Sequence, residues 1–207
     1  MKRMSMALIS AALSLVLLTG CFGSNWEMGE NIIGDDGSIS FFNGVDIGFA
    51  GVVETIADAE VIDANGIRAY NSTYAVTTED GQFAFVASQV SSARTIMNVF
   101  GRTVSDSDYE AMVRAMTDSM VSDITQSVPG STVSEPVITR EQITTDSGNT
   151  FDVGEIVYSM SGGGQNLEMK VTTIIDRHSI IMILTMRDGS PAGEAIADAV
   201  EQSIRFR

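Results

Sequence analysis

Cysteine and histidine each occur once in this chain of 207 residues, as Cys21 and His178, and basic residues are few. A single cysteine excludes an intramolecular disulfide and a metal site built from several thiolates. Twelve basic residues stand against 27 acidic ones, which gives a formal net charge of -15. This balance argues against nucleic acid and against an anionic bilayer surface as partners, because both would repel the chain.

The first 21 residues have the organisation of an export signal. Lys2 and Arg3 precede an uncharged run from Met4 to Leu18. As a helix, this run would rise about 22 Å, which is short of a hydrocarbon core of roughly 30 Å. The segment therefore suits a cleaved signal peptide better than a membrane span.

A small-residue tetrapeptide ends this segment at the cysteine. Leu18-Thr19-Gly20-Cys21 resembles the lipobox of bacterial lipoproteins. The resemblance implies a signal peptide over 1–20, cleavage before Cys21, a diacylglycerol thioether on its thiol, and acylation of the new amino group, for example with palmitate. Two or three acyl chains give stable anchoring. The alternative is an uncleaved anchor with an idle cysteine, which the short apolar run disfavours.

Cleavage at this point would leave 187 residues, enough for one domain with a substantial core. It would also leave 10 basic side chains against 27 acidic ones, a formal charge of -17. A solvated acidic surface is the simplest interpretation, and a cationic partner is the functional one. Residues 21–38 are rich in Gly, Asn, Asp and Ser, so we expect a lipidated tether there and a single head domain over 39–207.

Two aromatic residues beside Cys21 bear on the membrane. Trp26 has two open interpretations, an indole at the membrane interface or one packed on the domain. If the cell is Gram-negative, the resemblance to lipoproteins extends to sorting. Phe22 stands where proteins retained in the inner membrane often carry Asp, which favours the outer membrane, facing the periplasm.

Eight segments are rich in β-branched and aromatic residues and are bounded by turn sequences, so they predict strands. They are 39–42, 45–53, 67–76, 83–90, 137–145, 150–160, 166–176 and 179–187. The short connections among the last four require antiparallel neighbours. "SIIMIL" (179–184) is apolar on both faces and predicts a central strand covered on each side.

Two amphipathic helices are predicted. The first, about 105–126, begins with a capping pattern at Ser105–Asp108. Its apolar residues recur at helical spacing, and we interpret the methionines among them as core rather than as a metal-binding groove: Tyr109, Met112, Val113, Met116, Met120, Val121 and Ile124. The second, about 191–203, has Ser190 as its cap and Pro191 in its first turn. We expect its packing face at Ala195, Ile196, Ala199, Val200 and Ser203, and a short closing strand after it.

These elements together predict an α+β fold, an antiparallel β-sheet packed by both helices. The order of elements from Ile39 to Phe206 resembles the PsbP-like fold and, within it, the DcrB-like bacterial lipoproteins. The nearest local likeness is "HSIIMILTMRDG" followed by "AGEAIADAVEQSIRF". The resemblance is one of layout. It implies a PsbP-like sandwich with an accessory role and transfers no catalytic or binding residue.

The sequence contains only weak candidates for catalytic or metal-binding residues. His178 is predicted in an exposed hairpin turn, with no base or nucleophile assigned beside it. Ser159 and Ser161 precede a glycine turn and lack the strand-elbow-helix setting of a hydrolase nucleophile. The acidic groups do not match a twelve-residue calcium loop and predict turns and caps: Asp35-Asp36, Glu79-Asp80, and Asp106 with Asp108. We therefore expect no catalytic residue, no cofactor and no metal site.

Lipidation of Cys21 is thus the one site that the sequence predicts. The leading hypothesis is a lipid-anchored cell-envelope protein that is not an enzyme and whose head binds another envelope protein. The alternative is a lipoprotein that binds a small ligand or a cation, which predicts a pocket with polar lining between sheet and helix. A third hypothesis, an envelope hydrolase, requires two converging carboxylates with displaced pKa values.

Overall fold

The computed structural model describes residues 29–64, 67–92, 107, 109–111, 130, 132–162, 165–176 and 178–207. Within these residues the chain forms two antiparallel sheets and one long helix, α4 (Pro191–Ser203). The small sheet has the order β1-β2-β3-β12. Its strands are β1 (Ile32–Ile33), β2 (Ile39–Ser40), β3 (Val45–Ile47) and β12 (Ile204–Phe206).

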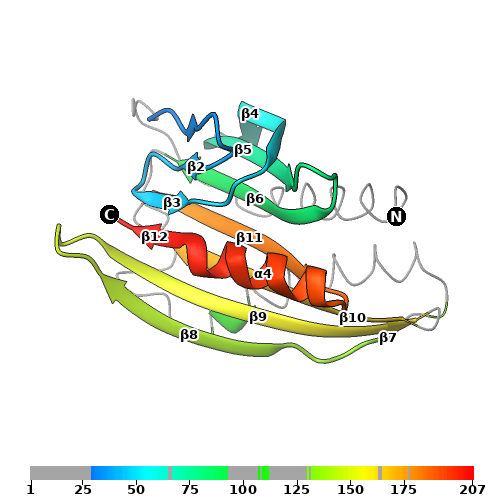
Figure 1. The fold of residues 1–207 in the computed structure, drawn as a ribbon. Coiled ribbons are helices and arrows are strands. Elements are labelled where there is room, and N and C mark those ends of the chain that lie inside the picture. The colour runs from blue at the N-terminus through cyan, green and yellow to red at the C-terminus, as the bar shows by residue number, and fades with distance from the viewer. Residues whose placement is uncertain are drawn as a thin grey trace.

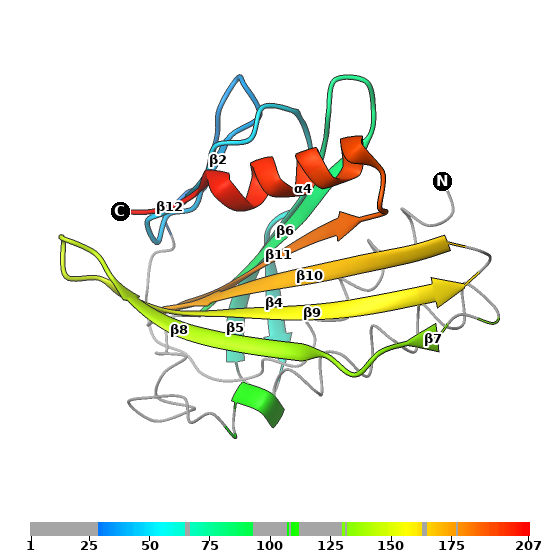
Figure 2. The same cartoon turned by 60° about the horizontal axis from the view of Figure 1, so that its bottom comes forward.

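The large sheet has the order β4-β5-β6-β11-β10-β9-β7, and β8 also pairs with β9. Its strands are β4 (Val52–Ala64), β5 (Ile67–Thr77), β6 (Phe83–Ser92), β7 (Thr132–Val133), β8 (Val137–Thr144), β9 (Thr150–Gly162), β10 (Gln165–Ile175) and β11 (Ser179–Arg187). The small sheet and α4 lie on the same side of it (Figures 1 and 2). We call this side the helix face and the opposite side the far face.

Each face of the large sheet carries its own apolar cluster. On the helix face, Val45 and Ile47 of the small sheet, Phe41 of the connection between β2 and β3, and Val200 of α4 pack against Phe85, Ile181, Ile183 and their neighbours. On the far face, Met169, Val171, Ile180, Met182 and Leu184 form a second buried cluster with Tyr109. The central strands of the large sheet are therefore buried on both sides.

The prediction of a central strand at 179–184 is confirmed. β11 lies between β6 and β10, with three strands on each side of it in the sheet order, and its first seven residues are buried. Alternate side chains of a strand point to opposite faces, so a strand covered on both sides must be apolar throughout. The run "SIIMIL" meets that requirement.

The predicted α+β class, a sheet packed by two helices in a PsbP-like sandwich, is wrong. Well over half of the structure is strand, and among the described residues α4 is the one helix of seven residues or more. No long amphipathic helix is described over 105–126; Ser107 and Tyr109–Ala111 are helical, and 112–129 lie outside the described residues. The protein is mostly antiparallel β.

Part of this error comes from β4. Residues 54–64 read "ETIADAEVIDA", whose Ala, Asp and Glu are depleted in strands, so no strand was predicted beyond Val53. In the structure, β4 pairs with β5 from Val52↔Thr77 to Ala64↔Ile67, with register shifts between Thr55 and Glu60. Pairing with a neighbouring strand therefore overrides the local preference.

The C-terminal helix is confirmed at its start. Ser190 is the N-cap of α4, where its Oγ accepts a hydrogen bond of 3.0 Å from Gly193 N, and Pro191 follows it. The predicted packing face is only partly right. Val200 is buried, but Ala195 and Ala199 are exposed, and Ala197 is buried instead. The predicted closing strand is β12, which pairs with β3.

Within the segment predicted as a tether, 21–38, the structure describes residues 29–38. They include β1, whose Ile33 pairs with Ile39 of β2. In the part of the chain that the structure describes, no helix has the length and apolar character needed to cross a membrane.

Candidate functional site

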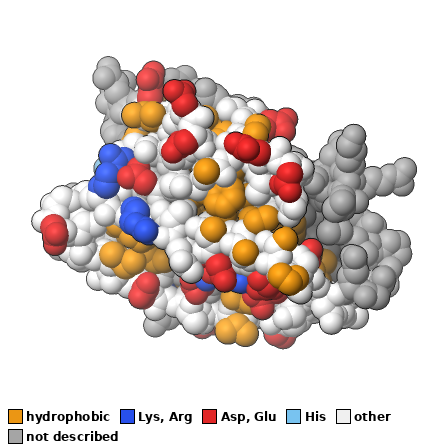
Figure 3. Space-filling model, viewed as in Figure 1, with side chains coloured by type: hydrophobic (Ala, Val, Ile, Leu, Met, Phe, Trp, Pro, Cys, Tyr) orange, Lys and Arg blue, Asp and Glu red, His pale blue; other side chains and the backbone are white. Residues whose placement is uncertain are grey.

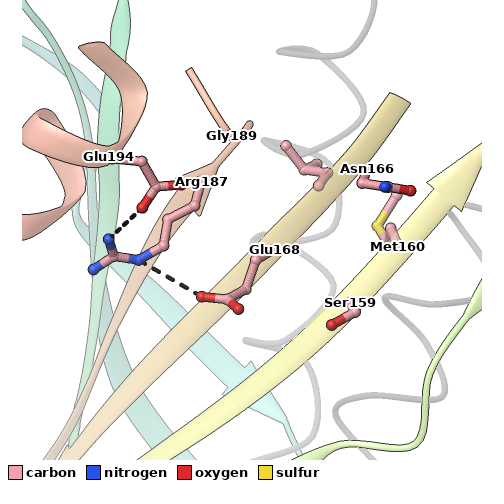
Figure 4. A pocket seen from close by; sticks show the side chains of 8 residues that line it. Ser159, Met160, Asn166, Glu168, Arg187, Gly189 and Glu194 are labelled. Atoms are coloured by element: carbon pink, nitrogen blue, oxygen red, sulfur yellow. Dashed lines mark hydrogen bonds and ion pairs between the residues drawn. The ribbon is translucent and has the colours of Figure 1, made fainter. Parts of the chain in front are cut away.

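A pocket of about 410 Å³ lies at the end of the large sheet, beside the first turn of α4 (Figure 4). Its lining comes from the end of β9, the start of β10, the end of β11 and the first turn of α4: Ser159, Met160, Asn166, Leu167, Glu168, Arg187, Gly189 and Glu194. This volume is within the range of small-ligand pockets. The polar and apolar side chains around it make it the leading candidate for a binding site.

Strand register brings these residues together. Glu168 of β10 lies opposite Arg187 of β11 and also opposite Ser159 of β9. Directly opposed residues share a face, so all three lie on the helix face. Leu167 and Met160 form the next opposed pair, and alternation puts them on the far face. The pocket thus extends around the end of the sheet.

Arg187 is the centre of the charged part of the pocket. Its guanidinium contacts four carboxylates: Glu168 at 3.6 Å, Glu194 at 2.8 Å, Asp198 at 2.7 Å and Glu201 at 3.0 Å. The hydrogen bond to Glu194 and the other carboxylates raise the pKa of Arg187 despite its burial. Since these carboxylates occupy the guanidinium, it is not available to bind an anionic ligand.

A second basic residue, Lys170, extends this group along β10. Its Nζ lies 2.6 Å from Glu155 and 3.0 Å from Glu201. Burial opposes its charge, but the hydrogen bonds to Glu155 and Glu201 outweigh it and raise the pKa of Lys170. We call Arg187, Lys170, Glu155, Glu168, Glu194, Asp198 and Glu201 the charge cluster. Two cations and five carboxylates give it a formal charge of -3.

Most of the negative members of the charge cluster are accessible, and its two basic members are not. Glu168, Glu194 and Asp198 keep 44%, 42% and 55% of their side-chain surface, whereas Arg187 keeps 17%. Figure 3 shows acidic side chains gathered beside α4 with little basic surface between them. A ligand that approaches the pocket therefore meets carboxylate oxygens first.

This arrangement suits a cationic group with an apolar stem. The exposed carboxylates of Glu168 and Glu194 would attract the positive head, as opposite charges do at a surface. Met160 and Leu167 offer apolar contact to a methylene chain, as in the stems of lysine and arginine. The amide of Asn166 can donate and accept further hydrogen bonds.

The structure does not bring the sequence's catalytic candidates together. Ser159 lines the pocket, but His178 precedes β11, whose other end reaches the pocket at Arg187. His178 lies in the hairpin between β10 and β11, and its backbone N donates to Asp176 Oδ1 at 2.6 Å. It is half-buried rather than exposed as predicted. Ser161 Oγ lies 2.8 Å from Thr132 Oγ1 on the edge strand β7.

Two of the acidic groups lie in turns, as predicted. Asp36 accepts hydrogen bonds from Ser38, and these lower the pKa of Asp36. Hydrogen bonds from Thr78 and Gln82 likewise lower the pKa of Asp80. Asp106 and Asp108 lie outside the described residues, as do Cys21, the predicted lipidation site, and Trp26. In the described ranges, no three His, Cys, Asp or Glu side chains are placed to hold a metal ion.

Sequence reasoning missed the charge cluster. One signal was present, because Glu194, Asp198 and Glu201 follow each other at i, i+4 and i+7 on the predicted C-terminal helix and so share a face. Glu168 and Lys170, two residues apart on a predicted strand, also share a face.

No protein-family model matches the chain, and no curated protein matches its sequence at a significant level.

Proposed function

We propose that this chain is a lipid-anchored cell-envelope protein whose head binds a cationic segment of another envelope protein, without itself being an enzyme. Lipid on Cys21 would anchor it, at the outer membrane facing the periplasm if the cell is Gram-negative. The observation that carries the binding role is the pocket, with the accessible carboxylates that line it and adjoin it.

The proposed partner is a protein segment with lysine or arginine side chains. Its positive head would contact Glu168 and Glu194, and its stem would contact Met160 and Leu167. Charge complementarity of this kind speeds association and sets specificity. The overall acidic charge of the chain acts in the same direction, because it attracts cationic partners over a distance.

A second candidate function is the binding of a small cationic solute. The position of the pocket favours it, because Glu194 of α4 and strands of the sheet line one space of about 410 Å³. A free cation and a cationic side chain would use the same carboxylates. Whether a protein partner is recovered with the chain therefore distinguishes the two functions.

The first experiment is crosslinking of the full chain in cells, followed by purification and mass spectrometry. The test variant is Glu168→Gln/Glu194→Gln, which removes two accessible charges and leaves Asp198 and Glu201 on Arg187. The matched control is Glu79→Gln, an exposed carboxylate in the turn between β5 and β6. We expect one recurrent envelope protein with the wild type and the control, and its loss or strong reduction with the test variant.

A Cys21→Ser variant tests the anchor in the same experiment. We expect it to lose acylation, measured by labelled palmitate, and to lose the partner. If no protein recurs with the acylated wild type, the partner proposal fails. Thermal stabilisation of the purified wild type by a polyamine, absent in Glu168→Gln/Glu194→Gln, would then support the small-cation function.

A further inference from the structure

A second group of polar side chains lies on the helix face, at the end of β11 away from the pocket. Ser179 of β11 is directly opposite Ser91 of β6, and Gln89 is two residues from Ser91 on the same face. The turn between β2 and β3 brings Asn43 to them. Asn43 Nδ2 donates to Ser179 Oγ and to Asp176 Oδ2, each at 2.8 Å. These residues form a polar end to an otherwise apolar face.

Three atoms of this group are buried without a hydrogen-bond partner in the described part of the chain: Asn43 Oδ1, Gln89 Nε2 and Ser91 Oγ. Gln89 and Ser91 are each 1% exposed. A polar atom that is buried without a protein partner loses its hydrogen bonds to water, and this desolvation destabilises the folded state. Most buried polar atoms in folded proteins therefore have a hydrogen-bond partner. Three of them on neighbouring residues indicate that something else binds there.

The three residues occupy neighbouring positions on the helix face. Side chains of directly opposed residues have Cβ atoms about 5 Å apart, so the Ser91 and Ser179 side chains are neighbours. Asn43 is joined to Ser179 by its own amide, which places Asn43 Oδ1 beside the same pair. Gln89 follows along β6 on this face.

The chemistry of the group selects an uncharged molecule. Asp176 already accepts hydrogen bonds from the backbone N atoms of His178 and Ser179, from Ser179 Oγ and from Asn43 Nδ2. The remaining atoms are one amide donor, one amide acceptor and one hydroxyl that can do either. An anion would meet the Asn43 carbonyl oxygen, and a cation would meet the Gln89 amide hydrogens, so neither matches the set.

We propose that Asn43, Gln89 and Ser91 form a binding site for a small, uncharged, hydrogen-bonding molecule. It accepts from Gln89 Nε2, donates to Asn43 Oδ1 and bonds with Ser91 Oγ. Its source is either solvent water or a small neutral solute such as a polyol or an amide. In either case it joins the turn between β2 and β3 to the large sheet. The site is separate from the pocket and does not depend on the proposed partner.

Thermal unfolding of the full chain tests the proposal through the sign of one shift. Ser91→Ala removes a hydroxyl that the bound molecule uses, so we expect Tm to fall by roughly 2–4 °C. The same direction is expected for Gln89→Met. If no molecule binds, Ser91→Ala removes an unpaired buried hydroxyl and Tm rises, which would overturn the proposal.

Ser88→Ala is the matched control on the same strand. Ser88 is 2% exposed, but its Oγ lies 3.0 Å from Thr73 Oγ1 and donates to Asn71 Oδ1 at 3.3 Å. Its Tm shift calibrates the loss of a buried hydroxyl that has known partners. A shift of the same sign and similar size in Ser91→Ala supports a bound molecule at Ser91.

A crystal structure of the wild-type chain, grown without organic additives, gives an independent readout. Density within hydrogen-bond distance of Asn43 Oδ1, Gln89 Nε2 and Ser91 Oγ supports the proposal, and its absence overturns it. Native mass spectrometry distinguishes the sources. A fixed added mass that Ser91→Ala lacks identifies a solute, and density with no added mass identifies water.

Discussion

The hydroxyl of Tyr109 lies 2.6 Å from Thr173 Oγ1, over a backbone position that has no side chain, Gly154. A Cβ at Gly154 would stand 1.8 Å from the Tyr109 hydroxyl oxygen. The guanidinium of Arg140 lies 5.1 Å from the centre of the Tyr109 ring and forms an ion pair of 3.2 Å with Asp152. Tyr109 is thereby fixed on the far face of the sheet.

Gly154→Ala should destabilise the protein because the methyl group and the Tyr109 ring cannot occupy the same space. We expect a loss of about 1–3 kcal/mol in the free energy of unfolding, the usual cost of overpacking. Chemical denaturation of the full chain measures it. Gly48→Ala is the control, since a Cβ there meets nothing within 4 Å, and it should change stability by less than about 0.5 kcal/mol. Equal effects of the two variants would contradict this account.

Asp188→Asn should lower stability at neutral pH and do so less in acid. Asp188 Oδ1 accepts from Ser190 N at 2.9 Å and from Ser190 Oγ at 2.6 Å, and these bonds lower the pKa of Asp188 below 3.8. The charged form thus contributes stability above pH 3.8, and the contribution disappears as the pH falls through the lower pKa of the folded state.

The measurement is the difference in Tm between wild type and Asp188→Asn at pH 7 and at pH 3. We expect a small deficit of the variant, on the order of 1–2 °C, at pH 7 and a smaller one at pH 3. Asparagine keeps an acceptor oxygen, so the comparison isolates the charge. A deficit that grows in acid would show that Asp188 acts in another way.

The strands that sequence could predict are those whose own residues favour a strand. "SIIMILTMR" is apolar on both faces, and it is β11 at the centre of the sheet. The start of α4 could also be predicted from local sequence, because the Ser190 cap and Pro191 determine it through local hydrogen bonds and backbone geometry. Most of β4 could not be found in this way, because Ala, Asp and Glu become a strand there only through pairing with β5.

The candidate site depended on contacts that no local pattern contains. Glu168 meets Arg187 through the register of β10 and β11, and Glu194 meets Arg187 only because α4 packs on that sheet. The stripe of acids on the helix was visible in the sequence, but its basic partner lay on a strand. The polar group at Ser91 and Asn43 needed the same kind of information, because strands of the large sheet and a turn of the small sheet build it.

Arg187→Met should destabilise the protein by leaving four carboxylates without their shared cation. Removing one partner from a buried ion pair costs about 3–5 kcal/mol, and the exposure of Glu168, Glu194 and Asp198 reduces this to about 1–3 kcal/mol. Methionine keeps the apolar stem, so packing changes little. Arg205→Met is the control, because Arg205 is the exposed residue of β12, and it should stay within about 0.5 kcal/mol of wild type.

The same variant has a distinguishing dependence on salt. Screening weakens the repulsion among the carboxylates, so the loss of unfolding free energy in Arg187→Met should shrink as the salt concentration rises from about 0.05 M to about 1 M. Urea denaturation at both concentrations measures it. A loss that is the same at both would indicate lost packing rather than lost charge pairing.

The wild type should lose stability at alkaline pH as Lys170 loses its proton, and Lys170→Met should lack this loss. Hydrogen bonds to Glu155 and Glu201 raise the pKa of Lys170 above 10.5, so the folded state holds this proton more tightly than the unfolded chain. The resulting stability is fully present below pH 10.5 and is lost as the pH rises through the pKa of the folded state. At pH 7 we expect Lys170→Met to be less stable than wild type by about 1–2 kcal/mol.

Denaturation at pH 8 and at about pH 11.5 measures the effect, and the difference between the two proteins should narrow at the higher pH. The sequence makes this comparison clean, because Lys170 is the only lysine after Lys2. Burial raises the pKa of Tyr109, but wild type and variant share this residue, so its effect cancels in the difference. A difference in unfolding free energy between the two proteins that stays constant from pH 8 to about 11.5 would mean that Lys170 stabilises α4 by packing alone. The charge cluster would then not depend on the proton of Lys170.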